Sequence, residues 1–68
     1  MTMPESLATA VERGDVDDLI RLVDALCASR EWDRLLELRD RCEQAVARGR
    51  QLWPVAAHAE YRLALEAP

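Results

Sequence analysis

The chain contains two cysteines and one histidine, the side chains best suited to metal binding or nucleophilic chemistry. The spacing of Cys27, Cys42 and His58 matches no zinc-ligand pattern. Both cysteines fall on apolar stripes of predicted helices, where a free thiol behaves as a small hydrophobic side chain. In a helical hairpin that turns near Arg30 they are offset by on the order of 10 Å, beyond the reach of a disulfide. The sequence therefore predicts two reduced, buried thiols and no metal site.

His58 also lacks the neighbours that a catalytic base requires. Glu60 is two residues away and points to another side of the predicted helix, so no dyad or triad is formed. Gly14 and Gly49 are isolated helix stops, so the chain has no glycine-rich phosphate loop. We therefore expect a protein that is not an enzyme and that needs no cofactor.

Four arginines gather late in the third predicted helix and could bind an acidic partner or phosphate. The favoured alternative is that arginine near a helix C-terminus complements the helix dipole while neighbouring carboxylates neutralise the rest. The spacing of Glu37 and Arg41, for example, predicts an i,i+4 pair. The four residues are Arg39, Arg41, Arg48 and Arg50.

Three aromatic residues are the remaining candidates for binding. Trp32, in the first turn of its predicted helix, is expected to close the core over the hairpin end. Trp53 and Tyr61 allow two interpretations: they are exposed anchors, because aromatic side chains dominate interface hot spots, or they pack downwards while the tyrosine hydroxyl stays hydrated. The sequence does not separate the two.

Composition restricts the class of protein. The 68 residues carry a net charge of −4, which disfavours general binding to nucleic acid. All nine basic residues are arginine, and alanine and leucine dominate, a bias typical of high-GC bacteria and of helical proteins. Since the sequence has neither a signal peptide nor a membrane-spanning apolar run, we expect a cytoplasmic protein that does not bind membranes.

Helix start and stop signals divide the chain into four short helices. Gly14 and Gly49 favour the left-handed conformation that ends a helix, and Asp15 and Ser29 are the expected N-caps of the second and third helices. Pro54 is expected to start the last helix after a loop over residues 50–53. The predicted helices cover residues 4–13, 16–28, 30–48 and 54–67.

The expected fold is all-α: four short antiparallel helices in a helical-hairpin, α-solenoid-like bundle, with the second and third helices as the central hairpin. Its core is expected to contain Leu22, Val23, Leu26, Leu35 and Leu38. Residues 1–68 form a single small domain, either complete or the N-terminal part of a longer helical-repeat protein. The third helix should bury one face, comprising Trp32, Leu35, Leu36, Leu38, Cys42, Ala45 and Val46.

The last helix is unusual because it is apolar on two sides. One stripe comprises Val55, Ala56, Ala59 and Leu63; the other comprises Ala57, Tyr61, Ala64 and Leu65. His58, Arg62 and Glu66 mark the expected solvent edge. Because the other helices can cover only one stripe, the second is expected to meet a second subunit or further chain.

Two segments resemble helical-repeat families. Ala10-Val11-Glu12-Arg13-Gly14-Asp15, continuing through residues 19–23, resembles the helix-turn-helix centre of an ankyrin repeat, without its Thr-Pro-Leu-His entry. Residues 57–64, Ala-His-Ala-Glu-Tyr-Arg-Leu-Ala, resemble the second helix of a tetratricopeptide repeat, without its companion first helix. The two resemblances imply the class of α-helical solenoids, most of which bind other proteins.

We therefore expect a non-catalytic protein-interaction or assembly module whose partner is another protein or a second copy in a homo-oligomer. The expected interaction residues are Trp53, Ala57, Tyr61, Ala64 and Leu65. The alternative is a small acidic regulatory protein, resembling an antitoxin or anti-regulator, that neutralises a basic partner. The residues that motivate this alternative are Asp15, Asp17, Asp18 and Asp24.

Overall fold

A computed structural model describes residues 6–68, and this part of the chain is all-helical, as predicted. The predicted start of the first helix at Pro4 lies outside the described residues. The helix begins at Leu7, because the Ser6 side chain accepts a hydrogen bond from the Thr9 backbone and caps it. The described helices are α1 (Leu7–Arg13), α2 (Val16–Ala28), α3 (Trp32–Ala47) and α4 (Trp53–Glu66).

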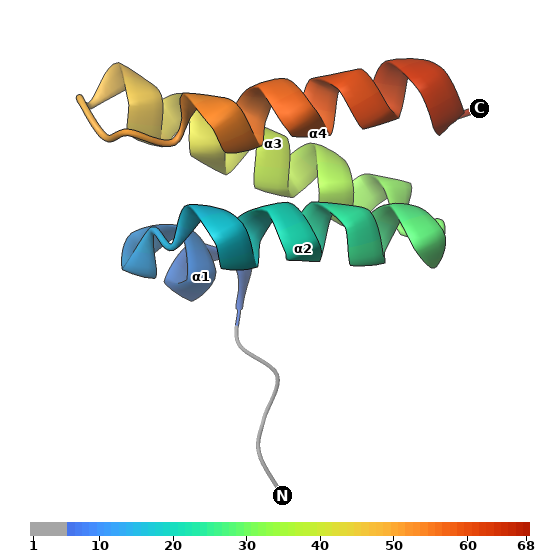
Figure 1. The fold of residues 1–68 in the computed structure, drawn as a ribbon, viewed down its shortest axis with the longest axis horizontal. Coiled ribbons are helices and arrows are strands. Elements are labelled where there is room, and N and C mark those ends of the chain that lie inside the picture. Colours follow the sequence, from blue (N-terminus) through green and yellow to red (C-terminus); the bar gives the residue numbers. More distant parts are fainter. Residues whose placement is uncertain (1–5) are drawn as a thin grey trace, which may run out of the picture.

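The helices form two layers. In Figure 1, α2 and α4 lie side by side and run in the same direction, while α3 runs the opposite way behind them. α1 packs against α3, and α3 also packs against α2 and α4. α1 and α3 therefore make one layer and α2 and α4 the other, which is how helical pairs stack in an α-solenoid.

The second and third helices form an antiparallel hairpin, as predicted, but this hairpin is not the most extensively packed pair of helices. α3 packs more extensively against α4 than against α2, and α2 also packs more extensively against α4 than against α3. Val55 and Ala59 of α4 are completely buried, and the small side chain of Ala59 allows close approach of the helices. The contact between α3 and α4 is thus the most extensive one between the two layers, and α2 packs less extensively against α3.

Most of the predicted helix ends are correct. Asp15 caps α2 by accepting a hydrogen bond from the Asp18 backbone at 3.1 Å. Gly14 and Gly49 have φ angles of 70° and 91°, the left-handed conformation expected after α1 and α3. α4 begins one residue earlier than predicted, at Trp53, with Leu52 as its N-cap residue and Pro54 in the first turn.

The predicted N-cap of the third helix is wrong. Ser29 is instead the C-cap residue of α2: its backbone amide donates to the Ala25 carbonyl at 3.0 Å. Arg30 then adopts a left-handed φ of 58°. The Arg30 and Glu31 amides donate back to the Cys27 and Leu26 carbonyls, which completes a Schellman motif. An arginine therefore occupies the position at which glycine is usual, and α3 begins only at Trp32.

The core is close to the predicted one. Val23, Leu26, Leu35 and Leu38 are buried as expected, but Leu22 is only half-buried. The third helix buries a narrower face than predicted, because Leu36 and Val46 are exposed while Trp32 packs at the edge of the core. The buried residues are Leu7, Ala10, Val11, Leu19, Val23, Leu26, Cys27, Leu35, Leu38, Cys42, Ala45, Leu52, Val55, Ala56 and Ala59.

Arg50, in the loop before α4, forms hydrogen bonds with the end of the short helix α1. Its guanidinium donates hydrogen bonds to the Val11 carbonyl at 3.0 Å and to the Glu12 carbonyl at 2.8 Å. These carbonyls lie in the last turn of α1, where backbone acceptors lack helical partners. A positive charge there also complements the helix dipole. A residue 39 positions away in sequence thus caps a seven-residue helix that would be marginal by itself.

Candidate functional site

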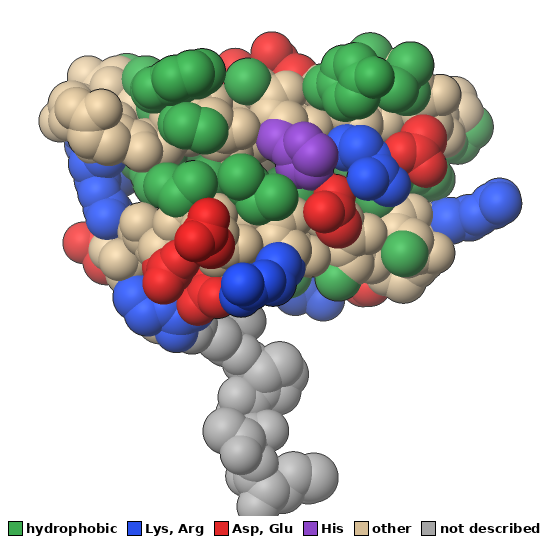
Figure 2. Space-filling view, in the orientation of Figure 1, with side chains coloured by type: hydrophobic (Ala, Val, Ile, Leu, Met, Phe, Trp, Pro, Cys, Tyr) green, Lys and Arg blue, Asp and Glu red, His purple; other side chains and the backbone are tan. Residues whose placement is uncertain are grey.

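The interaction residues predicted on the last helix lie together on the outer surface of α4. Trp53, Tyr61 and Leu65 are 63%, 62% and 63% exposed, and Ala57 and Ala64 are exposed between them. Figure 2 shows hydrophobic side chains along α4 at the top of the molecule. We call these five residues the outer stripe. The alternative that the two aromatic residues pack downwards is excluded by their exposure.

The outer stripe is free because the opposite side of α4 makes the contacts with the core. Val55, Ala56 and Ala59 are buried, and Leu63 packs at the edge of the core. Positions 53, 57, 61 and 65 recur every four residues, so they follow one side of a helix with 3.6 residues per turn. Of the two apolar stripes predicted on this helix, one is therefore buried against the core, and the other is not covered by any described residue.

A polar cluster joins α4 to α2 beside the outer stripe. The Asp24 carboxylate accepts hydrogen bonds from His58 Nε2 at 2.8 Å and Arg62 Nη1 at 3.0 Å, and we call these three residues the α2–α4 clasp. In Figure 2 the histidine lies on the boundary between the two helices, next to side chains of both charges. The expectation that His58, Arg62 and Glu66 form a plain solvent edge is therefore wrong for the first two, which are half-buried.

Further contacts of Arg62 support the α2–α4 clasp. Arg62 lies against the Cys27 side chain and forms an ion pair with Glu66, and these contacts raise the pKa of its guanidinium. Arg62 Nε is buried and faces the Glu66 carboxylate without the alignment of a hydrogen bond. Both polar partners of Asp24 come from α4 and both contact its Oδ1, so this one oxygen links α2 to α4. Over residues 6–68, no group of histidine, cysteine and carboxylate side chains is placed to hold a metal ion.

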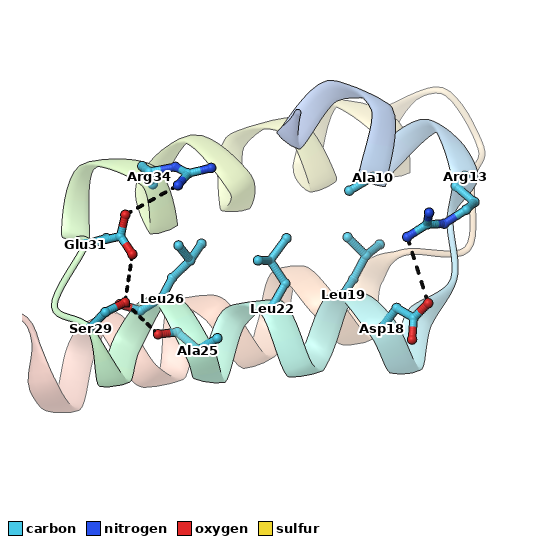
Figure 3. A pocket seen from close by; sticks show the side chains of 10 residues that line it. All are labelled: Ala10, Arg13, Asp18, Leu19, Leu22, Ala25, Leu26, Ser29, Glu31 and Arg34. Carbon is cyan, nitrogen blue, oxygen red and sulfur yellow. Dashed lines mark hydrogen bonds and ion pairs between the residues drawn. The ribbon is translucent and has the colours of Figure 1, made fainter. Parts of the chain in front are cut away.

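A second surface, at the other end of the molecule, was not anticipated from the sequence. A groove of about 430 Å³ lies between α1, α2 and the start of α3, and we call it the α1–α2 groove. Figure 3 shows Leu19, Leu22 and Leu26 projecting from α2 into it, with Ala10 of α1 opposite. Charged side chains of Arg13, Asp18, Glu31 and Arg34 stand at its two ends. The groove explains why Leu22 is only half-buried.

The groove exists because α1 is too short to cover α2. α1 has seven residues and α2 has thirteen, and α1 packs mainly on α3. α1 therefore borders only one end of the groove, and the start of α3, with Glu31 and Arg34, borders the other. At this end Ser29 donates a hydrogen bond to Glu31 at 2.7 Å, and this bond is the main cause of a lowered pKa for the Glu31 carboxyl. The rim of the groove is ordered by these local contacts.

Arginines of the predicted patch form contacts with neighbouring carboxylates and with the end of a helix. Arg39 pairs with Asp40 and Glu43, which together raise the pKa of its guanidinium, with the hydrogen bond to Asp40 as the largest cause. The predicted pair of Glu37 and Arg41 is present at 2.9 Å. Arg50 lies in the loop after α3 and caps α1 rather than the end of α3. These contacts favour the interpretation in which the arginines neutralise local charge.

Both cysteines are free and buried, as predicted. Burial raises the pKa of the Cys42 thiol to about 11, so the thiol is neutral at physiological pH. A neutral, buried thiol is a poor nucleophile because the thiolate is the reactive form. Cys42 is therefore a packing residue.

Comparison of the chain with models of known protein families, with curated proteins and with solved structures finds no match in any of the three. None of the helices in residues 6–68 is long and apolar enough to cross a membrane.

Proposed function

We propose that this chain is a non-catalytic protein-interaction module that binds through the outer stripe of α4. One observation carries the proposal: Trp53, Tyr61 and Leu65 form one row of large apolar side chains, each more than three-fifths exposed. Leaving such side chains in water costs free energy that a partner surface would recover. Tryptophan and tyrosine are also the side chains enriched at interface hot spots.

The alanines of the outer stripe support the same proposal. Ala57 and Ala64 lie between the large side chains and leave shallow gaps on the helix surface. A partner side chain that enters these gaps gains van der Waals contact at close range. Small and large residues therefore alternate in a way that suits interdigitation with another helix.

The size of the surface indicates weak binding. Two aromatic residues and a leucine at these exposures present about 300 Å² of apolar area, given the roughly 150–250 Å² that each aromatic side chain can bury. Matching area on a partner doubles this to about 600 Å², well below the roughly 1,200 Å² of a stable interface. We therefore expect dissociation constants in the high micromolar range unless neighbouring residues extend the contact.

The rival function, an acidic protein that neutralises a basic partner, has less support. Asp18 already pairs with Arg21 at 2.9 Å and with Arg13 at 3.8 Å. Asp24 belongs to the α2–α4 clasp. Asp15 accepts the N-cap hydrogen bond of α2, so three of the four aspartates that motivate this alternative are engaged within the molecule.

Sedimentation equilibrium tests the proposal with the chain itself as the first partner. We expect the mean mass to rise with concentration in the high micromolar range, and Ala57→Glu to abolish the rise by placing a charge in the outer stripe. Ala28→Glu is the matched control, because Ala28 is also an exposed helical alanine but belongs to neither surface. A parent protein that stays monomeric, with an Ala57→Glu variant of the same solubility, would remove the main support for the proposal.

A further inference from the structure

α1 is the least extensively packed of the four helices. It makes extensive contacts with α3 alone, whereas α2, α3 and α4 each pack against at least two other helices. It has seven residues, and the shortest of the other helices has thirteen. Figure 1 shows α1 on the side of the molecule away from α4. Because a helix of this length is marginal without tertiary contacts, α1 depends on a small number of interactions for its position.

The other three helices pack against one another without α1. Contacts join α2 to α3, α2 to α4 and α3 to α4, and we call these helices the three-helix unit. From α1 the core receives only Leu7, Ala10 and Val11. The largest fully buried side chains all belong to the three-helix unit: Leu19, Val23, Leu35, Leu38, Cys42 and Val55.

Two opposing effects decide whether α1 stays in place. Detachment would expose its three core side chains to water, which is unfavourable. Detachment would also return backbone freedom to seven residues, which is favourable because each ordered residue loses conformational entropy. Since only three side chains oppose the entropy of seven residues, the remaining polar contacts of α1 determine the balance.

Arg50 provides such contacts between α1 and the loop after α3. Besides its hydrogen bonds to the Val11 and Glu12 carbonyls, its guanidinium lies 3.8 Å from the Glu12 carboxylate. A β-carbon on Gly14 would overlap with Arg50 Nη2, so the guanidinium lies directly against the turn between α1 and α2. Arg50 therefore links the end of α1 to the three-helix unit.

The position of α1 also affects the α1–α2 groove. Ala10 and Arg13 of α1 form part of its wall, and Leu19 and Leu22 of α2 project into it (Figure 3). Without α1, this groove would continue onto the side of α3 that α1 covers. The amount of apolar surface exposed between α2 and α3 therefore depends on whether α1 is in place.

We propose that α1 is a latch that opens and closes as one unit while the three-helix unit stays folded, and that Arg50 holds it closed. Segments joined to the rest of a protein by few buried contacts open locally in this way. Opening uncovers an apolar cleft on α2 and α3, and closing covers it again. The latch does not involve the outer stripe, so its test is separate from that of the proposed function.

Hydrogen exchange of the full chain, followed by NMR for each residue, tests the latch. The Ala10 amide donates to the Ser6 carbonyl at 3.0 Å and the Gly14 amide to the Ala10 carbonyl at 3.1 Å, so these two amides report on the start and the end of α1. After correction for intrinsic rates, we expect both to exchange at least about 10-fold faster than the amides of Val23 and Ala59. Low urea concentrations should accelerate exchange at Val23 and Ala59 more, because global unfolding exposes more surface than local opening.

A substitution in α4 tests whether opening is independent of the three-helix unit. Ala57→Gly should accelerate exchange at Val23 and Ala59 about fivefold, through the cost of glycine in a helix, and should leave Ala10 and Gly14 unchanged. If Ala10 and Gly14 exchange at the rate of the core, or respond equally to Ala57→Gly, the chain unfolds as one unit and the latch is wrong. Fast exchange at Ala10 with core-like protection at Gly14 would indicate fraying of the helix start and would also overturn the latch.

A substitution of Arg50 tests its role. Arg50→Ala should accelerate exchange at Ala10 and Gly14 by about 10-fold or more, because it removes two hydrogen bonds to α1. Arg48→Ala is the matched control: Arg48 is an exposed arginine at the C-cap of α3, and its loss should leave the exchange of α1 unchanged. Equal exchange of α1 in the parent and in Arg50→Ala would overturn the assignment of Arg50.

Discussion

The attachment of α1 by Arg50 can be tested by replacing Gly14 with alanine. Gly14 has a left-handed φ of 70°, a conformation that costs an L-residue about 1–2 kcal/mol. A β-carbon at this position would also overlap with Arg50 Nη2 and displace the guanidinium. Loss of the hydrogen bonds to the Val11 and Glu12 carbonyls would remove about 0.5–1.5 kcal/mol each.

We therefore expect Gly14→Ala to lower the free energy of unfolding by about 2–5 kcal/mol, against the roughly 3–5 kcal/mol that a core of this size supplies. Urea denaturation followed by circular dichroism measures the change. Gly49→Ala is the matched control: Gly49 is also left-handed, but a β-carbon there meets no atom within 4 Å, so only the backbone cost applies. When Gly14→Ala is made in an Arg50→Ala background, it should lower the free energy of unfolding only by the cost of the left-handed backbone. Equal destabilisation by the two glycine substitutions would refute the role given to Arg50.

Three further predictions concern the buried face of α3, the turn at Arg30 and the buried thiol of Cys42. Leu35→Ala, at a completely buried position, should cost about 2–5 kcal/mol in urea denaturation, whereas Leu36→Ala, at 38% exposure, should cost less than half as much; equal costs would contradict the assigned face of α3. Arg30→Gly should raise the free energy of unfolding by about 1 kcal/mol because it relieves the left-handed arginine; a loss of stability would contradict the Schellman motif. Burial raises the pKa of the Cys42 thiol from 9.0 to about 11, so the thiol keeps its proton to higher pH in the folded protein than in the unfolded chain. The free energy of unfolding should therefore be at its full value below about pH 9 and should fall by on the order of 2–3 kcal/mol as the pH rises to about 11. Cys42→Val should remove this fall, and an unchanged pH profile in that variant would refute the assignment.

The sequence predicts the elements well because their signals are local. A cap such as Asp15 or a left-handed glycine such as Gly14 acts within one turn of its own helix, so each can be read without knowledge of distant residues. The two-sided apolar pattern of α4 likewise anticipates an apolar stripe opposite the buried one. The wrong assignment of Ser29 also has a local cause, because a serine can cap either the helix before it or the helix after it. The left-handed conformation of Arg30 decides between the two, and no residue type in the sequence indicates that conformation.

The contacts that the sequence does not reveal are those between distant residues. Asp24 and His58 are separated by 34 positions, and each alone has the pattern of a solvent-exposed polar residue. The α1–α2 groove depends on how far α1 covers α2, which is set by its packing on α3. Arg50 belongs to a predicted basic patch, and only the fold brings it to the end of α1. Such features follow from helix arrangement rather than from periodicity.

The central claim, that the outer stripe of α4 is a binding surface, is tested most directly by amide and indole chemical shifts over a dilution series of the isotope-labelled chain. We predict concentration-dependent shifts at Trp53, Tyr61 and Leu65. The buried face of α4 and the α2–α4 clasp should remain unchanged. Shifts that stay constant for the outer stripe from low micromolar to millimolar concentration would contradict the claim.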